Sequence, residues 1–244
     1  TMPDPTAPLA DRMRPTTLDH FHGQEKLIGE GRMLRQMLEA GSLPSLILWG
    51  PPGSGKTSLA KIISTATDAD FVFFSAVLSG VKEVRKIVEL AQVKLDELHL
   101  RTILFVDEIH RFNKSQQDAF LPHVESGLLT LIGATTENPS FQVIAPLLSR
   151  CRVLVLEPLS PDALAQIILQ ALDDKVYGLG SYRLQLEDQS LGILVEAADG
   201  DARRALNILE VASHLSLKRS TGSEQNPAIT IDDIEEATQT RSLR

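Results

Sequence analysis

Five short apolar runs stand out along the chain, at residues 46–49, 71–74, 103–106, 129–132 and 153–156, and all but the fourth, which contains Thr130, are unbroken. A strand with one wet face alternates apolar and polar side chains, whereas an unbroken run suits a strand that is buried on both faces. Strands buried in this way are usually parallel, because the helices that connect them cover both faces of the sheet. The pattern therefore predicts a parallel five-stranded sheet.

Helical patterns separate several of these runs. Residues 58–66 follow a Gly-rich segment, and residues 81–98 place apolar side chains at a helical spacing. A third helix is expected over residues 116–125, starting from Asn113, whose side chain can cap the helix while Gln116 reaches back. Alternating strands and helices indicate an α/β domain.

The pattern changes after about Pro158, where no further strand is expected. Ser160 and Pro161 supply a cap and a first helical residue for a helix over residues 162–173. Further helices are expected over residues 189–198, from residue 201 to about 217, and from residue 230 onward. The polar segment 218–227 contains Gly and Pro and predicts a loop. Residues 158–244 are therefore expected to form a small all-helical part.

Composition narrows the class of protein without naming a function. The 244 residues are 43% hydrophobic and 23% charged, as in ordinary soluble proteins, and no run approaches the roughly 18 apolar residues that a membrane span needs. The single cysteine, Cys151, cannot form an internal disulfide and is expected to be a small buried hydrophobe. The six histidines show no metal-ligand spacing.

The net charge of −8 argues against a surface that binds nucleic acid everywhere, but it leaves local basic patches open. Residues 82–86 and 110–114 are two basic stretches that could contact a nucleic acid backbone. The simpler interpretation of each is a solvated helix face.

A Gly-rich segment follows the first apolar run and opens the first helix. Glycines let backbone N–H groups converge on phosphate oxygens, and the helix N-terminus adds the positive end of its dipole. Lys56 is expected to reach the β- and γ-phosphates, and the Thr57 hydroxyl to bind Mg²⁺. The alternative, a chance turn with a surface lysine, is disfavoured by the strand-to-helix setting. The predicted phosphate-binding residues are Gly50, Pro51, Pro52, Gly53, Ser54, Gly55, Lys56, Thr57 and Ser58.

Two carboxylates end the run at residues 103–106. Ligands of open α/β sheets bind at the carboxyl ends of the strands, which is where Asp107 and Glu108 fall. Asp107 is expected to hold the Mg²⁺ shell, and Glu108 to polarise the attacking water as a general base. The alternative is a pair of capping acids at a strand end, which the nearby phosphate loop makes less favourable.

Two further groups of polar residues are candidates on local grounds. Thr135 and Thr136 follow the fourth run and could hydrogen-bond the attacking water or the γ-phosphate, although ordinary turn chemistry also explains them. Arg203 and Arg204 lie in the first turn of the helix that Asp201 caps, where the helix dipole disfavours cations. A nearby phosphate would remove this conflict, and so would pairing with neighbouring acids. Arg150 is on local grounds a solvated charge before the last strand.

Together these motifs resemble the AAA+ ATPases, and more narrowly the bacterial replication-associated recombination proteins of the RarA/MgsA group. The stretches specific to that group are residues 110–117 and 133–141, and residues 9–15, 149–152 and 200–207 extend the likeness over nearly the whole chain. Clamp-loader and Holliday-junction-motor subunits share several of the motifs and are the alternative among enzymes. A nucleotide-sensing module with little turnover is the alternative outside them.

The resemblance implies a role for individual residues. Thr136 matches the sensor-1 position, Arg203 matches a sensor-2 arginine that contacts the γ-phosphate of its own subunit, and Arg150 matches the arginine finger of a neighbouring subunit. Lys56 and these three residues join Glu108 as the expected catalytic set. The segment 1–25 is expected to pack near adenine, ahead of an α/β subdomain at 26–157 and a helical lid at 158–244. Within segment 1–25, the residues that match the adenine-packing part of the family are Arg14, Pro15, Gly23 and Gln24.

The resemblance also implies cofactors and partners. They are ATP and Mg²⁺, forked or single-stranded DNA, a single-strand-binding protein, and copies of the same chain in a tetramer. It further implies a cytoplasmic protein that acts at replication forks in repair and recombination. Full-length members continue into a C-terminal oligomerisation domain, so hydrolysis is expected to be weak in a chain that stops at Arg244.

Overall fold

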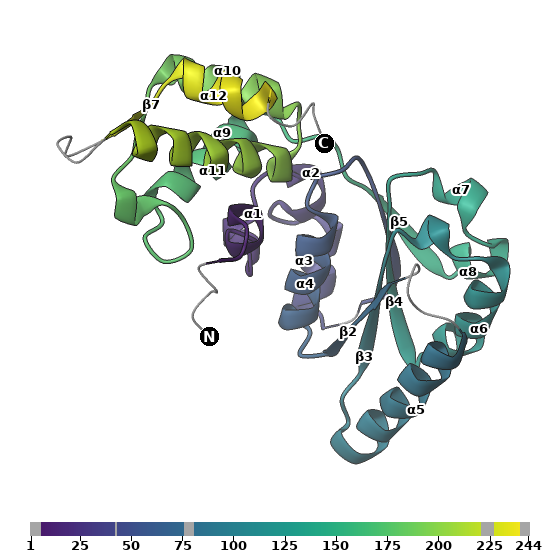
Figure 1. Cartoon of the computed structure of the whole chain (residues 1–244). Coiled ribbons are helices and arrows are strands. Elements are labelled where there is room, and N and C mark those ends of the chain that lie inside the picture. Colours follow the sequence, from purple (N-terminus) through teal and green to yellow (C-terminus); the bar gives the residue numbers. More distant parts are fainter. Residues whose placement is uncertain (1–5, 42, 76–80, 221–226, 240–244) are drawn as a thin grey trace. The chain divides into compact units, whose positions relative to one another are not determined.

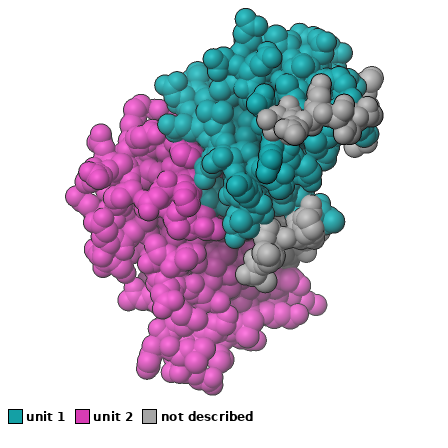
Figure 2. Space-filling view, turned by 90° about the vertical axis from the view of Figure 1, so that its left-hand side faces the viewer, with its two compact units in different colours: residues 1–15, 158–244 teal, residues 16–157 magenta. Residues whose placement is uncertain are grey.

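The computed structural model describes residues 6–41, 43–75, 81–220 and 227–239. The chain divides into two compact units, which Figure 2 shows in different colours. One unit is Thr16–Glu157, and the other combines Thr1–Pro15 with Pro158–Arg244. The first fifteen residues therefore belong to the second unit, whereas residues 16–25 belong to the first.

The first unit is built on the predicted parallel sheet of five strands. The strands lie in the order β2-β3-β4-β1-β5, and every neighbouring pair is parallel. Their bounds are β1 Ser45–Trp49, β2 Asp70–Ser75, β3 Thr102–Asp107, β4 Leu129–Thr135 and β5 Cys151–Val155. Each of the five apolar runs thus falls on a strand, with only Leu156 beyond a strand end, which confirms the fold class expected from them.

Successive side chains of the central strands enter two different cores, which explains the unbroken apolar runs. Leu46 and Leu48 pack on one face with residues of α3 (Met33–Glu39) and α4 (Lys56–Ala66). Ile47 packs on the other face with residues of α5 (Val81–Leu98), α6 (Lys114–Glu125) and α8 (Ala145–Leu148). Figure 1 shows α4 on one side of the sheet and α5 and α6 on the other.

Local signals fix where the helices of this unit begin. The Asn113 side chain accepts the Gln116 N–H at 2.9 Å, and the Gln116 side chain accepts the Asn113 N–H at 3.0 Å, which confirms the predicted capping box of α6. Short elements that no periodicity indicated complete the unit: η1 Leu18–His20, α2 Glu25–Ile28, η2 Ile109–Arg111 and α7 Pro139–Gln142. Spans of three or four residues are too short for a hydrophobic period to show.

The second unit is mainly helical and has its own core. Its helices are α1 Leu9–Arg12, α9 Pro161–Asp173, α10 Asp188–Ala198, α11 Ala202–Arg219 and α12 Ile231–Gln239, with a 3₁₀ turn, η3, at Gly180–Tyr182. Ser160 caps α9 through the Ala163 N–H, and Asp201 caps α11 through the Arg204 N–H, as the sequence predicted.

Two expectations for this unit were wrong. Strands do not stop at Pro158, because β6 (Gln185–Leu186) and β7 (Ala228–Ile229) form a small parallel pair. Two-residue strands carry no detectable period, so the sequence pattern missed them. The predicted loop also begins later, since α11 extends to Arg219, and residues 221–226 lie outside the described residues.

The start of α12 is held by a buried carboxylate. Asp233 accepts the Thr230 N–H at 2.8 Å and forms an ion pair with Arg219 at 2.6 Å. Burial alone raises the pKa of Asp233, but the hydrogen bonds from Arg219 and Thr230 together hold that pKa below its usual value. None of the helices in the described parts of the chain is long and apolar enough to cross a membrane.

Candidate functional site

The Gly-rich loop between β1 and α4 requires glycine at two positions, because of the backbone conformation there and the close packing around it. Gly53 and Gly55 have φ angles of 69° and 98°, in the region that favours glycine. A Cβ at Gly55 would meet the Phe21 ring at 2.6 Å. The loop backbone is therefore packed directly on an aromatic ring and leaves no room for a side chain at this position.

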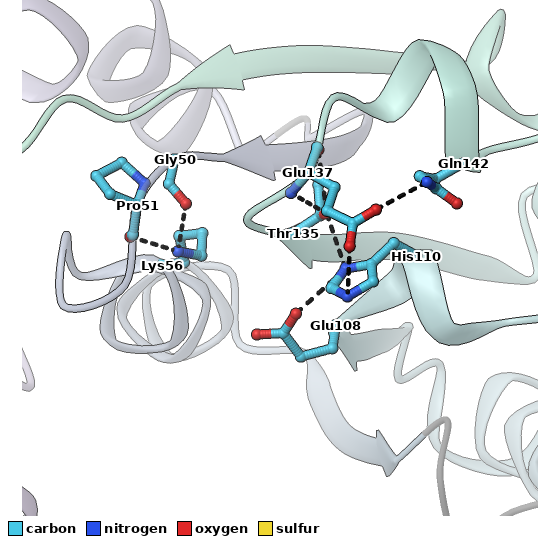
Figure 3. Close-up of polar contacts among 8 residues, drawn as sticks. All are labelled: Gly50, Pro51, Lys56, Glu108, His110, Thr135, Glu137 and Gln142. Atoms are coloured by element: carbon cyan, nitrogen blue, oxygen red, sulfur yellow. Dashed lines mark hydrogen bonds and ion pairs between the residues drawn. The ribbon is translucent and has the colours of Figure 1, made fainter.

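Lys56 is turned into the loop. Its side chain is buried, with 8% of the residue exposed, and Nζ donates to the carbonyl oxygens of Gly50 at 2.8 Å and Pro51 at 2.7 Å (Figure 3). Burying an ammonium group is costly unless oxygen acceptors surround it. These carbonyls hold the charge of Lys56 against the start of the loop, while Thr57 and Ser58 are half-buried in the first turn of α4.

Gln24 ties the loop to the end of the sheet. Its amide donates to the Ser54 carbonyl at 3.3 Å and to the Glu157 carbonyl at 2.7 Å, and its carbonyl accepts the Glu157 N–H at 3.0 Å. Gln24 follows Gly23, and both have positive φ angles, 62° for Gln24 and 80° for Gly23. Gln24 thus lies against the phosphate loop, whereas the expected packing of Gly23 and Gln24 around adenine stays a prediction.

The strand order brings the other predicted residues to the same edge of the sheet. β4 lies between β3, which ends at Asp107, and β1, which leads into the loop. The Gly50 N–H donates to the Thr135 carbonyl at 3.1 Å, so the tip of β4 touches the loop directly. The loop, the carboxylates and the two threonines therefore converge at the carboxyl ends of three adjacent strands, the edge where ligands of such sheets bind.

Glu108 leaves β3 in a strained conformation and meets a histidine. Its φ angle is 52°, a left-handed value that costs a residue with a side chain about 1–3 kcal/mol and is frequent at functional sites. The Glu108 carboxylate lies 3.2 Å from Nδ1 of His110 (Figure 3). The second nitrogen of that imidazole, Nε2, lies 3.6 Å from the Glu137 carboxylate.

The position of His110 corrects one expectation. Arg111 and Lys114 of the stretch 110–114 are exposed as expected, but only 12% of the His110 side chain and 5% of Phe112 are exposed. His110 lies in the 3₁₀ turn η2, directly after Glu108, so the backbone folds its ring back over the site. The basic charge of this stretch gave no indication of that turn.

The two threonines differ in what they can do. Thr135 is fully buried, and its hydroxyl lies 3.1 Å from Nδ1 of His110 and accepts the Glu137 N–H at 3.0 Å. Thr136 comes one residue later, after the end of β4, and is half-buried. Thr135 therefore belongs to the framework of the site, and Thr136 keeps the more accessible position at the strand tip.

Arg150 lies far from the phosphate loop of its own chain. It directly precedes Cys151, which pairs with Ser45 at the start of β1, whereas the loop follows the end of β1. At about 3.3 Å per residue, that separation is more than roughly 16 Å along the sheet. The Arg150 guanidinium forms an ion pair with Glu125 and donates to the Pro146 carbonyl at 2.8 Å. Within this unit, Arg150 cannot serve the loop beside β1.

The positive charges of Arg203 and Arg204 are not paired with a nearby acidic side chain among the described residues. In the described part of the chain, no ion pair joins either arginine to an acidic side chain, so the suggested pairing with Asp199, Asp201 or Glu196 is not observed. Arg14 in the same unit forms an ion pair with Asp11 at 2.7 Å, beside Pro15. These residues belong to the second unit.

Sequence reasoning missed three residues of the site. Phe21 supports Gly55, His110 contacts Glu108, and Glu137 contacts His110 and is held in turn by Gln142 at 2.7 Å. None has a recognisable spacing to the motif that it supports. Cys151 is partly rather than fully buried and packs against the core, and burial raises the pKa of its thiol to about 12 and keeps it protonated.

The groups at this edge suit a magnesium nucleotide. Thr57 and Asp107 supply a hydroxyl and a carboxylate, which are the hard oxygen donors that Mg²⁺ binds. The positive-φ glycines, the first turn of α4 and Lys56 supply N–H groups and positive charge for phosphates. The donor set thus matches both groups that the sequence predicted.

Comparison with known proteins agrees with this site. The family described as "ATPase family associated with various cellular activities (AAA)" matches residues 46–159, and the "AAA C-terminal domain" matches residues 180–244. Replication-associated recombination protein A of Escherichia coli K12 is 52% identical over 209 residues, covering 86% of this chain and 46% of that protein. The chain belongs to the AAA+ ATPases, in the replication-associated recombination protein A group.

Relatives extend beyond one bacterium. Replication-associated recombination protein A of Bacillus subtilis is 39% identical over 97% of this chain and 54% of its own length, and ATPase WRNIP1 of Dictyostelium discoideum is 43% identical over 90% and 25%. The chain spans about half the length of the bacterial relatives. These matches confirm the family that the motifs indicated.

Solved structures confirm the fold. The Thermotoga maritima RuvB Holliday junction branch migration motor superposes with a TM-score of 0.76 at 26% identity, over 94% of this chain and 73% of that chain. The likeness covers a nucleotide-binding fold of the AAA+ type followed by a helical region. The identity is half of that to the recombination protein of E. coli, which favours the recombination group over the branch-migration motors.

Proposed function

We propose that this chain binds ATP with Mg²⁺ and hydrolyses it, as the ATPase part of a protein that acts in replication-associated recombination. The observation that carries the proposal is the convergence of Lys56, Asp107 and Glu108 at one sheet edge, with the tip of β4 between them. One edge then holds phosphate-binding, metal-binding and general-base groups together. A nucleotide-sensing module with little turnover would need no such carboxylate pair.

Each residue of the loop has a task in this proposal. The backbone of residues 50–55 and the first turn of α4 bind the phosphates, and Lys56 neutralises charge on the β- and γ-phosphates. Thr57 and Asp107 hold Mg²⁺, which supplies charge neutralisation to the phosphate oxygens when it is bound. Glu108 accepts a proton from the attacking water, and Thr136 hydrogen-bonds the water or the γ-phosphate.

Residues of two further regions are proposed, by resemblance to the family, to contact the nucleotide. Gln24 touches the loop backbone at Ser54 and, with Gly23, Arg14 and Pro15, is proposed to surround the adenine. Arg203 is proposed to contact the γ-phosphate of its own subunit. Its support is the absence of an acidic partner among the described residues and its place in the first helical turn of α11, which would suit an approaching phosphate.

Arg150 is proposed to serve a neighbouring subunit. Its distance from the loop of its own chain excludes action in cis within the unit, while 41% of its side chain is exposed. An arginine supplied from a second copy stabilises the charge of the transition state in related phosphoryl transfers. The functional form is then a homo-oligomer, a tetramer by analogy with the family, with each active site shared between two chains.

The biological setting is proposed from the relatives. Their names place them in replication-associated recombination, and we infer that ATP hydrolysis here drives remodelling of DNA or protein complexes at forks, with a single-strand-binding protein as a candidate recruiter. A branch-migration or clamp-loading subunit is the second candidate, favoured by the likeness to RuvB.

Phosphate release by the full-length protein, with and without forked DNA, tests this proposal. We expect steady ATP hydrolysis that rises when forked or single-stranded ends are added and does not rise with blunt duplex of the same length. A protein that binds ATP without releasing phosphate in any of these conditions would support the sensing module instead. Equal stimulation by every DNA would count against a fork-specific role.

A further inference from the structure

The imidazole of His110 lies in a confined place between two carboxylates. Nδ1 is 3.2 Å from Oε2 of Glu108 and 3.1 Å from Oγ1 of Thr135, and Nε2 is 3.6 Å from Oε1 of Glu137 (Figure 3). Only 12% of the His110 side chain is exposed. Neither the family comparison nor the sequence motifs assign a task to this ring.

The surrounding hydrogen bonds determine which ring nitrogen carries a proton. The Thr135 hydroxyl donates its proton to the Glu137 carbonyl at 3.2 Å and accepts the Glu137 N–H at 3.0 Å. An ionised Glu108 carboxylate can only accept. Both neighbours of Nδ1 are therefore acceptors, so Nδ1 must carry the proton, which it donates to Thr135 at 3.1 Å beside the Glu108 carboxylate at 3.2 Å.

The ring itself is held from the opposite side. Glu137 faces Nε2, and Gln142 donates to the second oxygen of Glu137 at 2.7 Å. Gln142 in turn is held through its backbone carbonyl, which accepts from Gln117 at 2.9 Å. Anchors on β4, on α7 and, through Gln117, on α6 thus fix an imidazole whose contact with Glu108 is the one that faces the candidate chemistry.

Glu108 needs such a restraint. It follows the last residue of β3, its φ angle is left-handed, and 36% of its side chain is exposed. A glutamate side chain has three rotatable bonds, and a general base works only within hydrogen-bond reach of the proton that it removes. An Nδ1–H that a fixed ring holds 3.2 Å from Oε2 attracts the carboxylate and favours one orientation of it.

We propose that His110 is a positioning residue that orients the Glu108 carboxylate through its Nδ1–H. The inference rests on the proposed role of Glu108 as general base and deepens it. His110 does not touch the nucleotide or the water. It leaves one Glu108 oxygen free to accept the proton of the water while it holds the other, Oε2.

Kinetics of three substitutions in the full-length protein test the proposal. His110→Ala should lower kcat about 10- to 100-fold, as loss of an orienting partner does elsewhere, while the Kd for ATP changes less than about twofold. His110→Asn places an amide N–H near Nδ1 and should restore much of kcat, whereas His110→Gln places its amide near Nε2 and should not. His214→Ala, at an exposed histidine on α11, is the matched control and should behave like the wild type.

The proton itself gives a readout that needs no nucleotide. In protein labelled with ¹⁵N-histidine, the His110 resonances, assigned by their loss in His110→Asn, should show a proton on Nδ1. The Nδ1 resonance should shift in Glu108→Gln, because the charged acceptor is gone. A bare Nδ1, or an Nδ1 that is indifferent to Glu108→Gln, overturns the proposal.

Failure of this inference can be told from failure of the proposed function. If Glu108→Gln itself hydrolyses ATP at the wild-type rate, the general-base role is wrong, whatever His110 does. If Glu108→Gln is inactive while His110→Ala keeps or raises kcat, the positioning role alone is overturned. A fall in kcat that is matched by weaker ATP binding in His110→Ala, or by a lower melting temperature, would show a structural role and also overturn it.

Discussion

Glu108→Gln should lower kcat for ATP hydrolysis by about 10²–10⁴-fold, the range lost when a general base is removed. The amide keeps the shape of the side chain and can still contact His110, but it cannot accept a proton from water. ATP binding should be retained, because Lys56, Thr57 and Asp107 are unchanged. Phosphate release and nucleotide affinity, both measured on the full-length protein, separate the two effects.

Glu89→Gln is the matched control for this substitution. Glu89 is an exposed residue of α5, and its replacement removes the same charge without touching the sheet edge. The control should keep wild-type kcat. If Glu108→Gln also kept it, water would have to be activated by another group, and the assignment of Glu108 would be withdrawn.

Arg150→Ala should lower kcat about 10³–10⁵-fold in the oligomer, the range seen when an arginine finger is missing. The resting ion pair with Glu125 does not oppose this role. Both side chains are about 40% exposed, and surface pairs of that kind contribute only about 0–1 kcal/mol. A neighbouring nucleotide, with several negative charges, can therefore draw the guanidinium away at little cost.

Mixing two inactive variants distinguishes action in trans from action in cis. Subunits with Arg150→Ala retain an intact loop, and subunits with Lys56→Ala retain an intact Arg150. In mixed oligomers, some sites combine the intact half of each, so activity should reappear. Arg152→Ala, at an exposed arginine two residues along, should be active without mixing. Absence of recovery in oligomers shown to be mixed would contradict a shared active site.

The sheet could be predicted from sequence because its physical cause is local. Leu46 and Leu48 face one core and Ile47 the other, so the central positions of β1 must all be apolar, and the same holds for the central part of β3. The caps of α6, α9 and α11 were likewise predictable, since each is set by residues three positions apart. Elements of two to four residues, such as β6 and α7, are too short to leave a period.

The motif residues of the site were predictable, and the residues that support them were not. Lys56 and Asp107 could be recognised in the sequence because a Gly-rich loop and a strand end fix their positions within a few residues. Phe21 meets Gly55, and Glu137 meets His110, across long sequence separations that only the folded sheet closes. His110 is close to Glu108 in sequence, but the left-handed turn at Glu108 that folds the ring back is not encoded by a glycine.

For Arg150, the geometry of the sheet supports the role that the family resemblance suggests. Sequence alone presents it as a charge before a strand, and likeness to the family suggests a finger. The register between β5 and β1 adds a physical reason, because the start of β5 and the phosphate loop lie at opposite edges of one sheet. A residue so placed is available to a second copy of the chain rather than to its own loop.

Calorimetric titration of ATP with Mg²⁺ into this chain, with wild-type, Lys56→Ala and Lys61→Ala proteins, tests the central claim most directly. Lys61 is an exposed lysine on the same helix, α4, and controls for the loss of charge. Wild type and Lys61→Ala should bind one ATP with the same Kd. Lys56→Ala should bind roughly 10- to 100-fold more weakly, as expected when about 1.5–3 kcal/mol of hydrogen bonding to a charged group is lost. Equal affinity of all three proteins would contradict an ATP site at the loop between β1 and α4.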